Sequence, residues 1–185
     1  MDKGAEAYRR YLDGDDGGLA ELIRDYKDGL TVFLCSVTGD FSAAEEIMED
    51  VFFRLAVKKP KFKGRSSFKT WLYTIGRNAA LDEIRRRSRY AETPVEDCLN
   101  SIPAGEDPEL RYLKDETNRT LYRCNGQLNK DYRQALTLSY FNGLSNEQIA
   151  AVMHKNRRQI DNLLYRAKTS LRKALEKEGI SNKDI

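Results

Sequence analysis

The sequence has few of the residues that metal and disulfide chemistry require. Among 185 residues there are three cysteines and one histidine. Cys35, Cys98 and Cys124 are widely spaced and form no CxxC pair, which argues against a disulfide framework and against a zinc site. His154 has no cysteine or carboxylate at ligand spacing. We therefore expect no metal, no cofactor and three thiols that are buried or incidental.

Catalytic and membrane signatures are missing as well. The sequence contains no GxGxxG, no GK[ST] and no nucleophile elbow, so it shows no residues for catalysis and we expect no enzyme. It has no run of about 18 apolar residues that could span a membrane. Its start, MDKGAEAYRR, lacks the apolar stretch of a secretory signal. We expect a soluble, cytoplasmic protein without membrane insertion.

Strict two-residue alternation is nowhere long enough to predict a sheet, whereas helical spacing recurs along nearly the whole chain. The length suits two small domains, each with a modest core. Three of the four prolines fall in an acidic stretch poor in large apolar residues, which is typical of a linker. We predict an all-α protein with two small helical domains, 1–90 and 111–185, joined by a flexible acidic linker at 91–110.

Turn and cap signals divide the first domain. One or two helices are expected between Glu6 and Val37, with an interruption at DGDDGG. Another helix should run from Ala43 to Lys58 and a long one from Ser67 to Arg87. Because Ser42 precedes Glu45 by three residues, the pair has the form of a capping box at the start of the middle helix.

Positive charge is concentrated in two segments. Residues 54–90 carry twelve Lys or Arg against two acidic residues, and residues 132–177 are also basic. Cations neutralise phosphates and release counterions, while aromatic rings offer stacking faces that paired bases cannot use. Five rings lie among the charges of the first segment: Phe62, Phe68, Trp71, Tyr73 and Tyr90. We predict a surface for an opened nucleic-acid strand, the alternative being a solvated basic helix face.

The helix predicted from Ala43 to Lys58 has one apolar face and one acidic face that carries a ring. The acidic face comprises Glu46, Glu49, Asp50 and Phe53. An exposed ring can anchor a protein contact while carboxylates select a basic partner. The pattern therefore indicates a protein-docking patch, although a solvated acidic face stabilised by the helix dipole would look the same.

The long helix that follows should pack through an apolar stripe and leave a polar row free to face a groove. The stripe is Phe68, Trp71, Leu72, Ile75 and Ala79, and the polar row is Thr74, Asn78 and Arg85. Further arginines at the end of the helix, Arg86 among them, extend this row toward backbone phosphates.

The C-terminal segment has the sequence pattern of a helix-turn-helix, which is a short helix, a three-residue turn and a long helix. Ser145 and Gln148 form a capping box for the short helix, and Asn156 can cap the long one. Ile160 opens a buried stripe on the long helix. Its outward residues suit base edges and phosphates; they are Arg157, Arg158, Gln159, Asp161, Asn162, Arg166, Lys168 and Arg172. An ordinary amphipathic helix with a charged outer face is the alternative.

Three segments together resemble a known family. FKTWLYTIGRNAALDEIRRRSR is similar to region 2 of bacterial sigma-70 factors, AEEIMEDVFFRLAV to their preceding polymerase-docking segment, and LSNEQIAAVMHKNRRQIDNLLYRAKTSLRKAL to their region 4. The two-domain, extracytoplasmic-function (ECF) group is the most similar. The match covers about half the chain in the family's order and separation.

The resemblance implies a dissociable sigma factor that brings core RNA polymerase to a promoter and assists strand opening for transcription initiation. Glu46, Glu49, Asp50 and Phe53 match the face that docks on the beta-prime clamp helices. The second domain would contact the beta flap and read the minus-35 box through residues 157–168. An anti-sigma protein is an implied partner, and we expect a monomer when the chain is free.

Minus-10 recognition and melting are implied for the first domain. Asn78 matches the asparagine of the helix that reads the minus-10 box, and the loop 61–67 matches the one that receives a flipped base. The expected DNA-binding residues are Lys61, Phe62, Lys63, Arg65, Ser66, Thr74, Arg77, Asn78, Arg85 and Arg86.

Several positions depart from the family pattern. Ala56 stands where the family commonly has Trp, Arg158 where Gly is frequent, Asp161 where Lys is common and Leu163 where Arg is common. The preferred upstream box is therefore not inherited. The alternative is a conventional helix-turn-helix regulator that binds duplex operator DNA without polymerase, and the basic, aromatic segment 61–90 favours the sigma factor over it.

Overall fold

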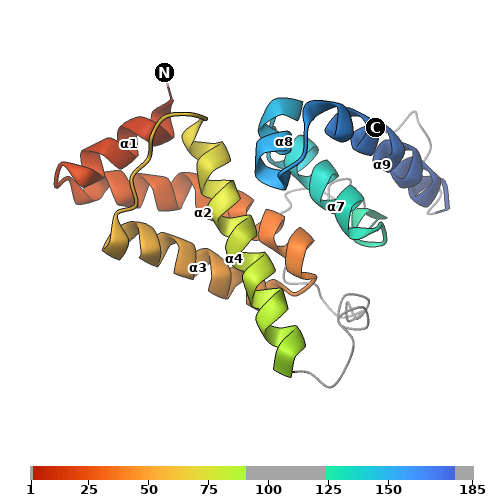
Figure 1. The fold of residues 1–185 in the computed structure, drawn as a ribbon, viewed down its shortest axis with the longest axis horizontal. Helices are drawn as coiled ribbons and strands as arrows, with labels where there is room; N and C mark the ends of the chain where they lie inside the picture. The colour runs from red at the N-terminus through yellow and green to blue at the C-terminus, as the bar shows by residue number, and fades with distance from the viewer. Residues whose placement is uncertain (1, 91–123, 178–185) are drawn as a thin grey trace.

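The computed structural model describes residues 2–90 and 124–177, and the regular elements of these stretches are all helices. The all-α prediction is confirmed, and the predicted linker lies outside the described residues. Figure 1 shows two groups of helices. The first group is α1 (Lys3–Leu12), α2 (Asp16–Thr38), α3 (Phe41–Lys58) and α4 (Phe68–Tyr90). The second group is α7 (Lys130–Leu136), the π-helical segment η2 (Thr137–Phe141), α8 (Asn146–Met153) and α9 (Arg157–Lys177).

Carboxylates at helix starts organise the first domain. Asp2 caps α1 by accepting a hydrogen bond from Ala5 N at 3.2 Å, and its other oxygen accepts from Phe68 N at 2.6 Å. One carboxylate therefore holds the N-termini of α1 and α4 together. The predicted interruption at DGDDGG is confirmed, because Gly14 turns with φ of 103° and Asp15 caps α2.

The predicted capping box at Ser42 and Glu45 is wrong. Helix α3 begins at Phe41, and Asp40 is its N-cap, accepting from Ala43 N at 3.2 Å. Gly39 ends α2 in the left-handed region with φ of 73°, and Asp40 follows in an extended conformation. The chain thus reverses one residue after α2, and a better cap than Ser42 is already in place.

Helix α1 fixes the start of the basic loop between α3 and α4. The ring of Tyr8 lies 5.4 Å from that of Phe68 and 5.6 Å from that of Trp71. Its hydroxyl donates a hydrogen bond of 2.7 Å to the carbonyl of Pro60. The hydroxyl of Tyr11 donates to Ala56 O at 2.8 Å. Each tyrosine buries its ring and donates its hydroxyl proton to a backbone carbonyl at or just after the end of α3. Together they hold that end of the helix in one position.

The second domain has the predicted helix-turn-helix. The capping box of Ser145 and Gln148 is present in both directions. Asn156 accepts from Gln159 N at 2.9 Å, while Gln159 Oε1 accepts from Asn156 N at 2.8 Å. Both local predictions are confirmed. The turn between the helices is made by His154, whose φ of 53° places it in the left-handed region.

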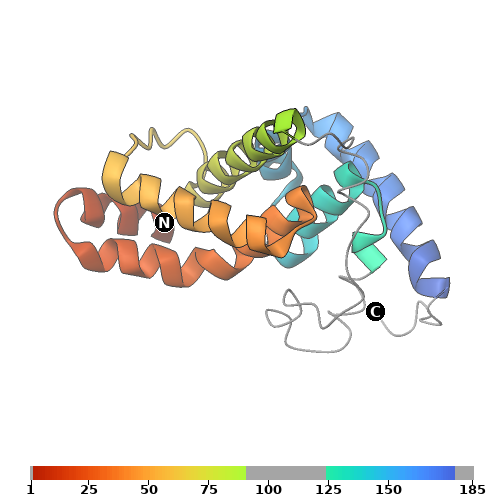
Figure 2. The ribbon, with the colours of Figure 1, turned by 90° about the horizontal axis from the view of Figure 1, so that it is seen from below.

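The two domains pack against each other. Helix α4 contacts α8, and α2 contacts both α7 and η2. Figure 2 shows the second domain at one end of the first, and Figure 1 shows the C-terminal end of α4 pointing away from it. Buried apolar residues of both domains belong to one continuous cluster, including Leu34, Leu72, Leu138 and Ile149. In the described part of the chain, no helix combines the length and apolar character needed to cross a bilayer.

The close approach of α1 and α2 generates a stability prediction. A Cβ added at Gly18 would meet the carbonyl oxygen of Ala7 and stand 2.9 Å from Tyr11 N. Both are backbone atoms that cannot move without shifting α1. We expect Gly18→Ala to lower the free energy of unfolding by about 1–3 kcal/mol, measured by urea unfolding followed by circular dichroism.

Gly17→Ala is the matched control. Its added Cβ would stand 2.9 Å from Oδ1 of Asp15, the exposed N-cap side chain that accepts from Gly17 N, so this side chain must turn and we expect a loss of at most about 1 kcal/mol, smaller than for Gly18→Ala. Equal stability of the two variants would contradict the prediction.

Candidate protein-docking and nucleic-acid surfaces

Helix α3 presents the predicted acidic face to solvent. Glu46, Glu49, Asp50 and Phe53 are exposed, whereas the opposite face is buried in the core. The ring of Phe53 is 65 % exposed, which is unusual for a side chain that gains by burial. The geometry is as predicted from helical spacing, and the docking role stays a prediction.

Sequence reasoning missed one member of this face. Val57, one turn after Phe53, is 62 % exposed and continues the same side of the helix. The four-residue spacing of two apolar side chains on a face otherwise acidic was the available signal. We call Glu46, Glu49, Asp50, Phe53 and Val57 the α3 face.

Arginines at the end of α4 reach toward the α3 face. Arg87 lies 3.3 Å from Asp40 Oδ2 and 3.8 Å from Glu46 Oε2. Glu83 accepts hydrogen bonds from both Arg86 and Arg87 at 2.8 Å. These bonds lower the pKa of Glu83 to about 2. The cations at this end of α4 are therefore partly neutralised within the protein.

The basic loop between α3 and α4 is as exposed as predicted, except for its ring. Lys61, Lys63, Arg65 and Ser66 are exposed. Phe62 is half-buried, with its ring 5.7 Å from that of Phe68 and 5.3 Å from that of Trp71. The loop can thus offer cations and a hydroxyl around an anchored ring.

Two of the five rings that were expected to offer stacking faces are buried; for Phe68 this confirms the predicted packing stripe of the long helix, and for Tyr73 the expectation is wrong. Phe68 is 0 % exposed and Tyr73 1 % exposed. The ring of Tyr73 stacks on that of Phe33 with centroids 5.5 Å apart. Both rings pack inside the protein instead of facing solvent, because neighbouring helices cover much of the circumference of α4.

The predicted DNA-binding residues of α4 differ in their exposure to solvent. Asn78 is exposed, as are Arg85 and Arg86, and Thr74 is half-buried with its hydroxyl bonded to the carbonyl of Thr70. Arg77 is only 9 % exposed, and its Nε donates to Gln134 of the second domain at 3.1 Å. In this arrangement Arg77 is therefore covered and not available to DNA.

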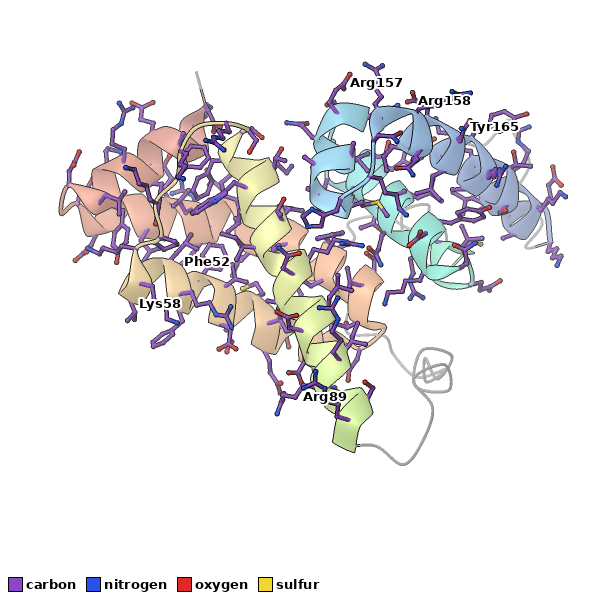
Figure 3. The ribbon with its side chains drawn as sticks, viewed as in Figure 1. Phe52, Lys58, Arg89, Arg157, Arg158 and Tyr165 are labelled. Atoms are coloured by element: carbon purple, nitrogen blue, oxygen red, sulfur yellow. The ribbon has the colours of Figure 1, made fainter. Side chains whose placement is uncertain are left out.

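The outer side of α9 carries all seven predicted minus-35 residues in exposed positions. Figure 3 shows Arg157, Arg158 and Tyr165 on the edge of the second domain that faces away from α4. Tyr165 is 75 % exposed and was missed, although its place seven residues after Arg158 puts it on the same face. This surface combines cations, amides and a ring.

Two carboxylates hold the first arginine of α9. Arg157 pairs with Glu147 of α8, and its Nε lies 3.8 Å from Asp161 Oδ2. The other oxygen of Asp161 accepts a hydrogen bond of 2.6 Å from Asn146 Nδ2. Asp161 therefore links the starts of α8 and α9 and orients a cation at the end that enters a groove in helix-turn-helix proteins.

The remaining residues that could take part in metal or thiol chemistry are His154 and the cysteines. Nε2 of His154 lies 3.2 Å from Asn78 Oδ1. Cys35 and Cys124 are buried, and Cys98 lies outside the described residues. Across residues 2–90 and 124–177, no group of three or more His, Cys, Asp or Glu side chains is placed to hold a metal ion.

Two segments of the chain match known protein families. Residues 22–90 match the family Sigma-70 region 2, and residues 118–171 match Sigma-70, region 4. The RNA polymerase sigma-H factor of Pseudomonas aeruginosa is 30% identical over 171 residues, covering 88% of this chain and 89% of the relative. The ECF RNA polymerase sigma factor SigM of Bacillus subtilis is 27% identical over 164 residues, covering 88% of this chain and 97% of the relative.

Solved structures show the same fold. The sigma factor RpoE of Bartonella quintana, in complex with the anti-sigma factor NepR, superposes with a TM-score of 0.67 at 23% identity, covering 85% of this chain and 96% of that one. CnrH, in complex with the cytosolic domain of CnrY, gives a TM-score of 0.60 at 19% identity, covering 94% and 95%.

The Glu83 cluster makes a pH prediction. The pKa of Glu83 is lowered from 4.5 to about 2 by Arg86 and Arg87, so its stabilisation is present above pH 4.5 and is lost as the pH falls toward 2. We expect Glu83→Gln to have a smaller loss of melting temperature between pH 5 and pH 3 than the wild-type chain. Asp82→Asn, which leaves the cluster intact, is the control. Parallel pH profiles for Glu83→Gln and wild type would rule out the assignment.

Proposed function

The chain belongs to the sigma-70 family, in its extracytoplasmic-function group. We propose that its three exposed surfaces have separate roles in promoter recognition; they are the α3 face, the basic loop with α4, and the outer side of α9. The protein is a sigma factor: it binds core RNA polymerase and directs it to promoters, and it is an initiation factor rather than an enzyme. In the proposal, residues 1–90 dock on the polymerase and read the minus-10 box. Residues 111–185 read the minus-35 box, and residues 91–110 link the two domains.

The α3 face is the proposed contact with the beta-prime clamp helices of the polymerase. The observation that carries this assignment is an exposed phenyl ring among three carboxylates, on a helix whose other side is buried. Burial of such a ring contributes most of the energy at many interfaces, and the carboxylates favour a basic partner. A regulator that binds operator DNA without polymerase would not need an exposed ring among carboxylates in addition to two basic surfaces.

The basic loop and α4 are the proposed minus-10 reader. Extruding a base costs about a few kcal/mol of unstacking energy, and the loop supplies Lys61, Lys63 and Arg65 to neutralise the phosphates of the separated strand. Phe62 packs on Phe68 and so holds the loop backbone between Lys61 and Lys63 against the domain. The amide of Asn78 can both donate to and accept from a base edge.

The outer side of α9 is the proposed minus-35 reader. Its N-terminal residues are placed to enter a major groove, and Arg157 is already oriented by Glu147 and Asp161. The beta flap would contact the same domain. An anti-sigma protein is a further proposed partner, as RpoE binds NepR and CnrH binds CnrY.

Docking can be tested by changing the α3 face without disturbing the core. We expect Asp50→Lys combined with Phe53→Ala to weaken binding to purified core polymerase by about thirtyfold, equivalent to roughly 2 kcal/mol. Both side chains are exposed, so the melting temperature should be retained. Titration of labelled chain with core enzyme measures the affinity.

Lys58→Ala is the control for docking, because Lys58 is exposed on the same helix but off the α3 face. Unchanged core affinity of the double variant, or an equal loss in Lys58→Ala, would remove the docking assignment. Run-off transcription from a cognate promoter, with core enzyme and wild-type chain, provides the positive reference.

Strand opening can be separated from docking at Asn78. We expect Asn78→Ala to reduce open-complex formation by about tenfold, as the loss of one base-edge contact implies, while leaving core affinity unchanged. Permanganate reactivity of promoter thymines, measured with saturating core enzyme, reports the opening. Normal reactivity in the variant would reject the role of Asn78.

A further inference from the structure

Helix α1 lies outside both segments that match known families, which are residues 22–90 and 118–171. The helix packs along α2 and also contacts α4. Its N-cap and two of its tyrosines form hydrogen bonds with residues at least 45 positions away in the sequence. These partners lie at or beside the ends of the basic loop, which runs past α1 to the start of α4 (Figure 1). The contacts of α1 therefore converge on the loop.

Both ends of the basic loop are bonded to α1. At the start of the loop, the carbonyl of Pro60 accepts a hydrogen bond of 2.7 Å from the hydroxyl of Tyr8. At its end, Phe68 N donates to the carboxylate of Asp2 at 2.6 Å. Burial raises the pKa of Tyr8 to about 12, so its hydroxyl stays protonated and keeps its role as donor at neutral pH. One helix thus fixes where the loop begins and where it ends.

Lys59 opens the loop in a backbone conformation that residues other than glycine rarely adopt. Its φ of 42° and ψ of 56° lie in the left-handed region, where the Cβ crowds the following carbonyl. Such a conformation persists only where the surrounding structure holds it. Here Tyr8 binds the carbonyl of the next residue, and Lys59 Nζ lies 4.6 Å from the centroid of the Tyr11 ring. Helix α1 therefore holds the turn by which the chain leaves α3.

The middle of the loop is connected to α1 through shared rings. Phe62 packs on Phe68 and Trp71, with centroid distances of 5.7 and 5.3 Å. Tyr8 packs on the same two rings, at 5.4 and 5.6 Å. The exposed cations of the loop lie on either side of Phe62 and between the two bonded ends. Their backbone is consequently supported at the start, the middle and the end of the loop.

We propose that α1 is a positioning element for the basic loop, in which Tyr8 and Asp2 fix the loop in the conformation that receives an extruded base of the promoter strand. The inference rests on the proposed minus-10 role of the loop. A loop that already has its binding conformation loses less conformational freedom when the strand binds, and its contacts with the base are more accurate. Tyr8 and Asp2 act on the strand through the loop, so they are positioning residues.

Two tyrosines on α1 provide a matched pair of substitutions. Tyr8→Phe keeps the ring in its cluster and removes the hydroxyl that binds Pro60. Tyr11→Phe removes the same kind of bond, but its acceptor is Ala56 O at 2.8 Å, which belongs to α3. Both tyrosines are buried, so we expect the two variants to lose similar stability. Only Tyr8→Phe releases an end of the loop.

The measurement uses the full chain bound to core polymerase and a premelted promoter. Nontemplate bases of the minus-10 box are replaced one at a time by an abasic site, and the affinity for each DNA is measured by fluorescence anisotropy. With the wild-type chain, removing the base that the loop receives should weaken binding about tenfold. With Tyr8→Phe the same removal should weaken binding by about threefold or less, because the base and the loop are no longer fully coupled. Tyr11→Phe should keep the wild-type ratio.

This ratio separates positioning from general stability. A variant that only destabilises the domain weakens binding to the intact and the abasic strand by the same factor, so its ratio is unchanged. Melting temperatures and circular dichroism compare the stability and folding of the variants.

Asp2→Ser tests the other end of the loop. Serine is as good an N-cap as aspartate, so α1 keeps its cap. Its single short side-chain oxygen leaves Phe68 N without the acceptor that the second carboxylate oxygen provides. We expect the abasic ratio to fall as in Tyr8→Phe, and this variant decides the question if Tyr8→Phe does not fold.

The possible results distinguish the positioning role from the function on which it rests. A reduced ratio in Tyr8→Phe or Asp2→Ser, with the full ratio in Tyr11→Phe, supports positioning by α1. Full ratios at every position in both folded variants overturn it, and so does an equal reduction in Tyr11→Phe. If the wild-type chain shows no abasic effect at any position, the proposed minus-10 role of the loop fails, and this inference fails with it.

Discussion

Helix α4 is packed on two sides, and the rest of the structure depends on this double packing. Phe68, Leu72 and Ala80 are completely buried in the core of the first domain. At Gly76 an added Cβ would stand 3.0 Å from Leu30, so α2 approaches closely. An adjacent side carries Arg77, which bonds to the second domain. The candidate minus-10 residues of α4, such as Asn78, are consequently held on a rigid element whose position is set by the core, whereas the cations at 61–66 lie on the loop before it.

Internal carboxylates restrain the cations of both candidate DNA surfaces. Glu83 holds Arg86 and Arg87 at one end of the molecule, and Glu147 holds Arg157 at the other. Exposed pairs of this kind contribute little to stability, so phosphates can displace them. Their larger effect is on orientation and on nonspecific affinity, which rises with every unpaired cation.

Rules that relate residues close in sequence predicted most of the fold. The errors arose where two caps were available near one helix start, or where contacts with distant segments decided the burial of a side chain. The capping box at Ser145 depends on residues three apart, and it was correct. The box at Ser42 failed because Asp40 offers an earlier cap after the turn at Gly39. Phe68 is buried, as its place in the predicted apolar stripe requires. Tyr73 was expected to offer its ring and is buried too, because helical spacing does not reveal how much of a helix is covered by its neighbours. For the same reason the contact of Arg77 with Gln134, residues 57 positions apart, could not be foreseen.

The chemistry of the domain contact suits a protein that must change partners. The contact also buries apolar side chains of both domains in one cluster, among them Leu72 and Ile149, so separating the domains exposes apolar surface at a cost. Amide groups such as those of Asn142 and Gln134 can exchange their bonds for water at little net change, and the cations Lys130 and Arg133 gain solvation when the domains part. The polar bonds therefore make this contact less costly to separate than a purely apolar contact of the same area, although the shared apolar cluster must still be exposed.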